Sequence, residues 1–116
     1  MFRTAAFAAA AVLTVGFAAQ PALAADGAQL FNMQCKMCHG GSTMGPSLVG
    51  IAGGKIGEGA FAFSPALKAK GGTWTDANLD AFLKSPPAFA PGTKMLIAVP
   101  NDENRAALVT YIKTLK

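Results

Sequence analysis

Two cysteines and the only histidine occur together in the run Cys35-Lys36-Met37-Cys38-His39. Two thiols separated by two residues and followed at once by histidine form the attachment pattern of a c-type haem. The spacing has a chemical reason, because both thiols can reach one edge of a porphyrin and add across its vinyl groups. The next residue then lies under the iron. The run therefore predicts one covalent haem, attached through Cys35 and Cys38, with His39 as an axial ligand.

Two other kinds of site use the same residues. Cys35 and Cys38 would form a redox dithiol in an enzyme of the Cys-x-x-Cys type. Together with His39 they would supply three of the four ligands that structural zinc requires. The chain has no further cysteine or histidine, so the fourth zinc ligand would be a carboxylate or water. The dithiol interpretation leaves His39 and the more distant motifs unexplained.

The first residues have the pattern of a secretory signal peptide. Arg3 gives a positive start, residues 4–19 are uncharged and rich in alanine, and small residues follow. Cleavage after Ala24 fits the Ala-x-Ala pattern, and cleavage after Ala25 is the alternative. A retained membrane anchor is the weaker interpretation, because the apolar run is shorter than the ~20 residues of a spanning helix. We therefore expect residues 1–24 to be a signal peptide and residues 25–116 to be one periplasmic domain.

The charge of the mature chain is small. Without Arg3, nine basic and six acidic side chains remain, a net charge of +3. This charge is too weak to indicate nucleic-acid binding, but it is compatible with docking on an acidic protein partner. The candidate docking charges are scattered lysines, of which the first and last flank the haem motifs: Lys36, Lys68, Lys70, Lys84 and Lys94.

The mature sequence predicts several short helices and no convincing strand. Four side chains suited to N-caps precede them: Asp26, Ser64, Thr75 and Asn101. The helix after Ser64 is expected to run from Pro65 to Lys70, and the next is expected to end at Pro86-Pro87. A clean apolar stripe marks the last helix: Leu108, Tyr111, Ile112 and Leu115. The fold class is therefore all-α, with helices and loops around a cofactor.

Pro46 is a candidate partner for His39. Residues 40–46 form a loop by composition, and the Pro46 carbonyl remains free to accept a hydrogen bond. A metal-bound imidazole usually donates its second N–H to such an acceptor, which sets the orientation of the ring. A plain turn proline is the alternative.

Met95 is the best candidate for the second axial ligand of the iron. A thioether is a soft, neutral ligand that favours ferrous iron. Pro91 and Gly92 make a bent loop that can position it, and Thr93 places a hydroxyl nearby. Core packing is the ordinary role of a methionine and stays the alternative here.

These motifs, in this order, resemble those of the class I cytochromes c, which are small soluble electron carriers. The resemblance extends from Gly27 to Lys116. It implies covalent haem at Cys35 and Cys38 and axial ligation by His39 and Met95. It also implies that the first and last helices cross, with Gly27 and Phe31 near Leu108 and Tyr111. Residues around the haem are implied as well: Pro46, Ser64, Trp74 and Thr93, with the Trp74 indole N–H directed at a propionate.

The chain departs from the family pattern around the haem. Gly54 occupies the position where the family commonly has an arginine beside a propionate, and Leu67 occupies a position where it commonly has an asparagine. Phe63 and Phe82 stand where tyrosine is common, and Ile97 replaces an aromatic residue. Because Phe82 cannot hydrogen-bond the sulfur, we expect the bond between methionine and iron to be less restrained than in relatives with tyrosine.

The resemblance implies a periplasmic one-electron carrier rather than an enzyme. Its expected partners are membrane-bound redox complexes of a respiratory or photosynthetic chain: a donor like the quinol–cytochrome c oxidoreductases and an acceptor like a terminal oxidase or reductase. No nucleic-acid partner is expected, and the protein is expected to be a monomer. The alternative is a haem c protein with a displaceable sixth ligand that binds a small molecule or peroxide.

Overall fold

Six helices form the regular structure of residues 9–13, 16 and 25–116, which are the residues described by this computed structural model. They are α1 (Gly27–Gln34), α2 (Lys36–His39), α3 (Pro65–Lys70), α4 (Asp76–Lys84), α5 (Pro86–Phe89) and α6 (Asp102–Thr114). The β-pairing found in this part of the chain is one isolated antiparallel bridge between Lys55 and Thr73. The all-α prediction is therefore confirmed.

Each expected N-cap is made by a side-chain oxygen that accepts a backbone N–H. The pairs are Asp26 with Ala28 and Gln29, Ser64 with Leu67, Thr75 with Asn78, and Asn101 with Asn104. Such caps satisfy N–H groups that have no partner within the helix. The predicted starts of α1, α3, α4 and α6 are therefore correct.

A short helix that the sequence did not predict follows the expected end of α4 at Pro86-Pro87. α4 ends at Lys84, but the two prolines then occupy the first turn of a further helix, α5. Proline is tolerated there because the first N–H groups of a helix need no internal partner. α5 places Phe89 against Trp74, with 5.7 Å between ring centroids and 21° between the planes.

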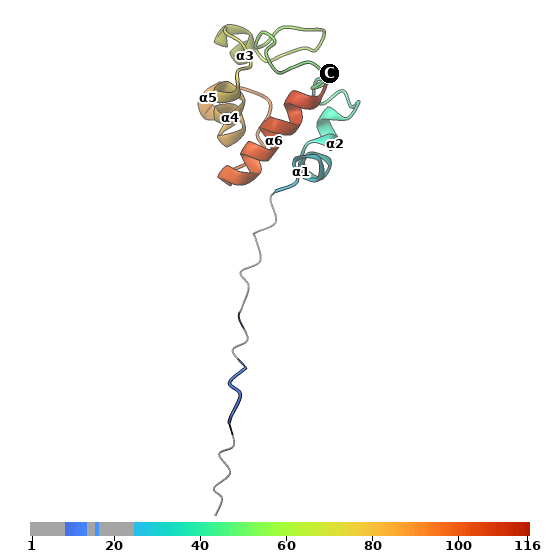
Figure 1. Ribbon diagram of the computed structural model, residues 1–116. Coiled ribbons are helices and arrows are strands. Elements are labelled where there is room, and N and C mark those ends of the chain that lie inside the picture. Colours follow the sequence, from blue (N-terminus) through green and yellow to red (C-terminus); the bar gives the residue numbers. More distant parts are fainter. Residues whose placement is uncertain (1–8, 14–15, 17–24) are drawn as a thin grey trace, which may run out of the picture.

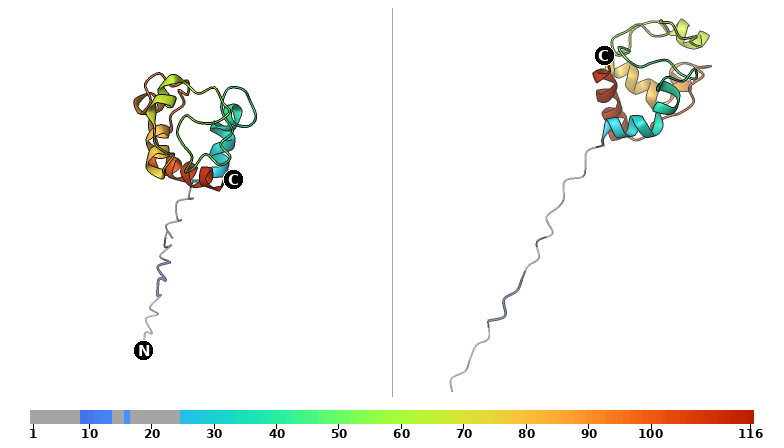
Figure 2. Two further views of the ribbon diagram at one scale, coloured as in Figure 1. Left: turned by 90° about the horizontal axis from the view of Figure 1, so that it is seen from above. Right: turned by 90° about the vertical axis from the view of Figure 1, so that its right-hand side faces the viewer.

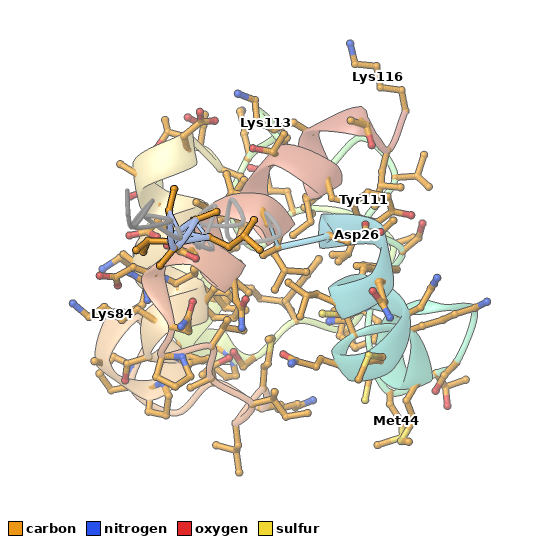
Figure 3. All side chains as sticks on the ribbon, turned by 60° about the horizontal axis from the view of Figure 1, so that its bottom comes forward. Asp26, Met44, Lys84, Tyr111, Lys113 and Lys116 are labelled. Atoms are coloured by element: carbon orange, nitrogen blue, oxygen red, sulfur yellow. The ribbon has the colours of Figure 1, made fainter. Side chains whose placement is uncertain are left out.

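The first and last helices cross, as the resemblance implied. Figure 1 shows α1 packed beside α6, and Figure 3 shows Tyr111 of α6 next to Asp26 at the start of α1. The rings of Phe31 and Tyr111 have centroids 5.2 Å apart, and Leu108 is fully buried. A Cβ atom at Gly27 would lie 2.9 Å from Cβ of Tyr111, closer than side chains pack. Glycine at this position therefore permits the crossing.

The helices surround a single apolar core. The pair α1–α2 and the pair α4–α5 lie on opposite sides of the domain, with α6 between them (Figures 1 and 2). Residues of α1, α4, α5 and α6 meet in the core, among them Phe31, Leu79, Phe89 and Ile112. The long segment between α2 and α3 is fixed at several points, including a 2.6 Å hydrogen bond from Gly50 N–H to the Leu115 carbonyl.

The predicted signal peptide falls mainly on residues outside those that the structure describes. Among the described residues, no helix combines the length and the apolar character needed to cross a bilayer.

Candidate haem site

The two cysteines are placed by an almost continuous helix. Cys35 separates α1 from α2, yet its N–H bonds the Phe31 carbonyl at 2.9 Å and its carbonyl accepts from His39 N–H at 2.9 Å. Cys35 and His39 are therefore one helical turn apart. Both cysteines are free thiols; Cys35 is buried and Cys38 is half-buried. Burial raises the pKa of the Cys35 thiol, and the neighbouring Cys38 raises it further, so Cys35 is neutral at pH 7.

The imidazole of His39 is held in a fixed orientation. Its Nδ1 lies 2.8 Å from the Pro46 carbonyl oxygen. A carbonyl only accepts, so Nδ1 carries a proton, and in the neutral imidazole Nε2 then keeps a free lone pair. That lone pair is what a metal requires, because a histidine ligand is neutral and is oriented by the hydrogen bond of its other nitrogen. The hydrogen bond expected from the sequence is present, and the role of His39 as a ligand stays a prediction.

Gly45 brings the loop close to the same imidazole. A Cβ at this position would lie 3.0 Å from both Cε1 and Nδ1 of His39, and 3.0 Å from the Cys38 carbonyl oxygen. Few real Cβ atoms come so near another side chain. The sequence placed Gly45 in the loop at residues 40–46, but it did not predict the contact with the ring, because the two residues meet only after the loop folds back.

Met95 lies in the loop between α5 and α6 and contacts the core. It follows α5, is half-buried and packs against the core cluster. Backbone hydrogen bonds fix its loop at both ends: Thr93 N–H to the Ala90 carbonyl at 2.9 Å, and Val99 N–H to the Leu83 carbonyl at 2.8 Å. His39 lies at the end of α2 and Met95 in the loop after α5, and their role as the two axial ligands stays a prediction.

A buried hydroxyl without a partner tests whether these residues fit a haem. Thr93 is 6% exposed, and its Oγ1 has no hydrogen-bond partner in the described part of the chain. Leaving such a group unpaired costs about 1–3 kcal/mol. A haem would supply propionate acceptors, and the imidazole and thioether are suitable donors for its iron. The residues present therefore fit the cofactor.

An aromatic cluster surrounds Trp74. The indole is buried and its centroid lies 5.2 Å from that of Phe82, which in turn contacts Phe89 edge-on at 5.7 Å. The Trp74 backbone pairs with Gly53 and Gly54 at 2.8 Å on both sides. These contacts fix the ring, while the predicted direction of its N–H toward a propionate stays a prediction.

The departures from the family pattern lie in different surroundings. Phe82 and Leu67 are buried and Phe63 is half-buried, so apolar side chains stand in the interior. Ile97 is 51% exposed and belongs to the surface. Ser64 is 3% exposed, and its hydroxyl already caps α3.

Arg105 is a functional candidate that the sequence reading did not single out. It is 5% exposed, and its guanidinium donates to Asp80 and Asp102, both at 2.6 Å. It also donates to the Val99 and Pro100 carbonyls, which belong to the segment after Met95. The available signal was its place on the buried face of the last helix, three and four residues before Leu108 and Val109.

The zinc alternative receives no support from the arrangement of side chains. Within residues 9–13, 16 and 25–116, no group of three or more His, Cys, Asp or Glu side chains is placed to share a metal ion.

Comparisons with known proteins give one consistent result. The family model described as Cytochrome c matches residues 24–116. The cytochrome c of Tetrahymena pyriformis is 43% identical over 96 residues, which cover 79% of this chain and 88% of that protein. The cytochrome c2 of Rhodomicrobium vannielii is 39% identical, covering 76% and 75%. The solved structure of cytochrome cH from Methylobacterium extorquens matches with a TM-score of 0.70 and 38% identity, covering 76% of this chain and 94% of that one.

Proposed function

Because the chain belongs to the cytochrome c family, as a class I c-type cytochrome with one covalent haem c, we propose that it is a periplasmic one-electron carrier. The family makes it an electron carrier in general. The proposal adds the residues that hold the haem, the place where the protein works and the partners it serves.

Cys35 and Cys38 are proposed to form the two thioether bonds, with His39 and Met95 as the axial ligands. The observation that carries this assignment is the 2.8 Å contact between His39 Nδ1 and the Pro46 carbonyl. It orients the ring and, in the neutral imidazole, leaves Nε2 free to bind a metal, as a histidine ligand requires. Ser64, Trp74 and Thr93 are proposed to line the same site.

Haem supplies a one-electron couple that amino-acid side chains lack. The chain's own residues orient and shield it. Pro46 fixes the imidazole, the bonded loop around Met95 holds the thioether, and the core excludes water. A thioether ligand raises the reduction potential, and an apolar surround also favours the less charged ferrous state. The protein would therefore accept and release an electron with little structural change.

The proposed location is the periplasm, reached by a signal peptide at residues 1–24 with the domain at 25–116. Support comes from the Arg3 start and alanine-rich run, and from bacterial relatives such as cytochrome c2. The proposed partners are a membrane-bound donor like the quinol–cytochrome c oxidoreductases and an acceptor like a terminal oxidase or reductase. We propose that the protein acts as a monomer and catalyses no reaction of its own.

The test is production with a haem-attachment system, followed by comparison of Met95→Ala with Met44→Ala. Met44 is a matched control because it is an exposed methionine at the periphery of the domain (Figure 3). We expect Met95→Ala to abolish the ferric absorption band typical of thioether ligation and to lower the potential by roughly a few tenths of a volt. Met44→Ala should change neither. A high-spin ferric spectrum in the unaltered protein would favour the displaceable-ligand alternative.

A further inference from the structure

Three exposed methionines lie in the segment that carries the haem motif. Met33 is 71% exposed, Met37 is 82% exposed and Met44 is 70% exposed. Methionine is ordinarily a core residue, so three exposed methionines in one short segment need an explanation. The proposed axial ligand Met95 differs from them, because it is half-buried and packs against the core cluster. In the described part of the chain, the thioethers therefore divide into three accessible ones and one that is protected.

The elements of the haem motif place these methionines around the proposed attachment site. Met33 of α1 and Met37 of α2 line the same open groove as Cys38. Met44 lies at the periphery of the domain, in the loop that leads from His39 back to Pro46 (Figure 3). An oxidant that approaches the haem edge at Cys38, or is formed there, would therefore meet these side chains.

A thioether reacts with an oxygen-donating oxidant through a lone pair on its sulfur. With hypochlorous acid the sulfur is oxidised by two electrons and gains oxygen, while the O–Cl bond breaks and chloride and a proton are released. The product is methionine sulfoxide, which reductases return to methionine. The reaction needs access to the sulfur and an available lone pair. Burial limits the access to Met95, and the proposed bond to iron would engage its lone pair.

We infer that Met33, Met37 and Met44 are the oxidation sites of this protein and take up oxidant before the axial thioether does. The inference rests on the proposed function, because a sulfoxide at Met95 would replace the thioether that the iron needs. At the exposed positions the added oxygen faces water, so the core and the haem ligands stay unchanged. When the oxidant is limiting, all thioethers compete for it, and the share that reaches Met95 falls as faster sites are added.

The test treats the haem-loaded protein with about one equivalent of hypochlorous acid and measures the sulfoxide at each methionine by peptide mass spectrometry. We expect Met95 to receive less than about a tenth of the added oxygen. In the triple variant Met33→Leu, Met37→Leu and Met44→Leu, which keeps side-chain volume, this share should rise about fivefold and the ferric thioether band should weaken with it. Val49→Leu is the control, because it changes a sulfur-free side chain that is 61% exposed, and it should leave the share unchanged.

Other outcomes would overturn the inference. Oxygen spread evenly over the methionines, or gathered at Met95, would show that exposure does not set the order of oxidation. A share at Met95 that is the same in the triple variant as in the unaltered protein would show that the exposed methionines protect nothing. The proposed function fails by a separate observation, a ferric spectrum without the thioether band before any oxidant is added. The protective role would then fall with it, while the peptide map would still decide which thioethers react first.

Discussion

The roles of Gly45 and Thr93 follow from their contacts in the folded protein. Gly45 fits against the imidazole because it has no side chain, and Thr93 buries a hydroxyl for which the described residues provide no partner. One residue makes room for the proposed ligand, and the other offers a donor to the cofactor. Each of them can be tested by a small substitution.

Gly45→Ala should displace the imidazole of His39. The new methyl group would lie 3.0 Å from two ring atoms, and relief of this contact would strain the hydrogen bond to Pro46. We expect a loss of about 1–3 kcal/mol in unfolding free energy, measured by guanidinium titration. The yield of covalent haem should also fall. Thr43→Ala, at an exposed position of the same loop, is the control. Equal stability of the two variants would show that the loop can move aside.

Thr93→Val should destabilise the haem-loaded protein by about 1 kcal/mol, because the variant keeps the shape but loses the proposed hydrogen bond to the cofactor. The measurement is the denaturation midpoint followed by haem absorbance. Thr73→Val changes an exposed hydroxyl and serves as the comparison. If Thr93→Val is as stable as the unaltered protein, the hydroxyl makes no bond to the haem.

The side chain of Arg105 helps to hold the segment between Met95 and α6 in place. Arg105 of α6 bonds two carbonyls of this segment and reaches Asp80 of α4. Its hydrogen bonds with Asp80 and Asp102 hold the pKa of Arg105 above its ordinary value, so it remains a cation. Two helices and the methionine loop are therefore joined at one point.

Arg105→Leu should loosen this segment and weaken thioether ligation, because the Val99 and Pro100 carbonyls lose their donor. We expect a lower thermal midpoint and a weaker thioether band in the ferric spectrum. Lys113→Leu is the control, since it breaks an ion pair with Asp76 whose side chains are 49% and 66% exposed. Such surface pairs contribute little to stability. Equal effects of both variants would assign Arg105 no special role in holding Met95.

For the whole domain, the haem is expected to complete the core. Several apolar side chains that pack against the core remain half-buried, including Leu48, Ile51, Phe63 and Met95. A ligand that binds only the folded state stabilises it, by more the tighter it binds, and a covalent cofactor is not released. The protein without haem should therefore be much less ordered.

Removal of the cofactor should accordingly lower the helical circular dichroism signal to about half or less of that of the haem-loaded protein. The haem-free form is obtained by production in the cytoplasm of a host that lacks haem-attachment enzymes. Reversible unfolding of the haem-free and the haem-loaded forms gives the difference in their unfolding free energies. A haem-free protein with full helical signal and a cooperative melt would mean that the polypeptide core suffices.

Local signals predicted much of this fold. The four caps, the bounds of α3 and the contact between His39 and Pro46 all depend on residues close in sequence. α5 was missed because two prolines both end one helix and suit the first turn of another. The bond between Arg105 and Asp80 joins residues 25 positions apart, and no periodic pattern specifies such a pair. Exposure of Met33 and Met37 likewise depends on which faces the other elements cover.

The packing of α1 against α6 has a consequence for how the protein is made. The attachment motif is synthesised early and the helix that covers its neighbourhood is synthesised last. A chain delivered from its amino end therefore presents Cys35 and Cys38 to the attachment machinery while the domain is still open. The domain can then close around the haem after the haem has been attached.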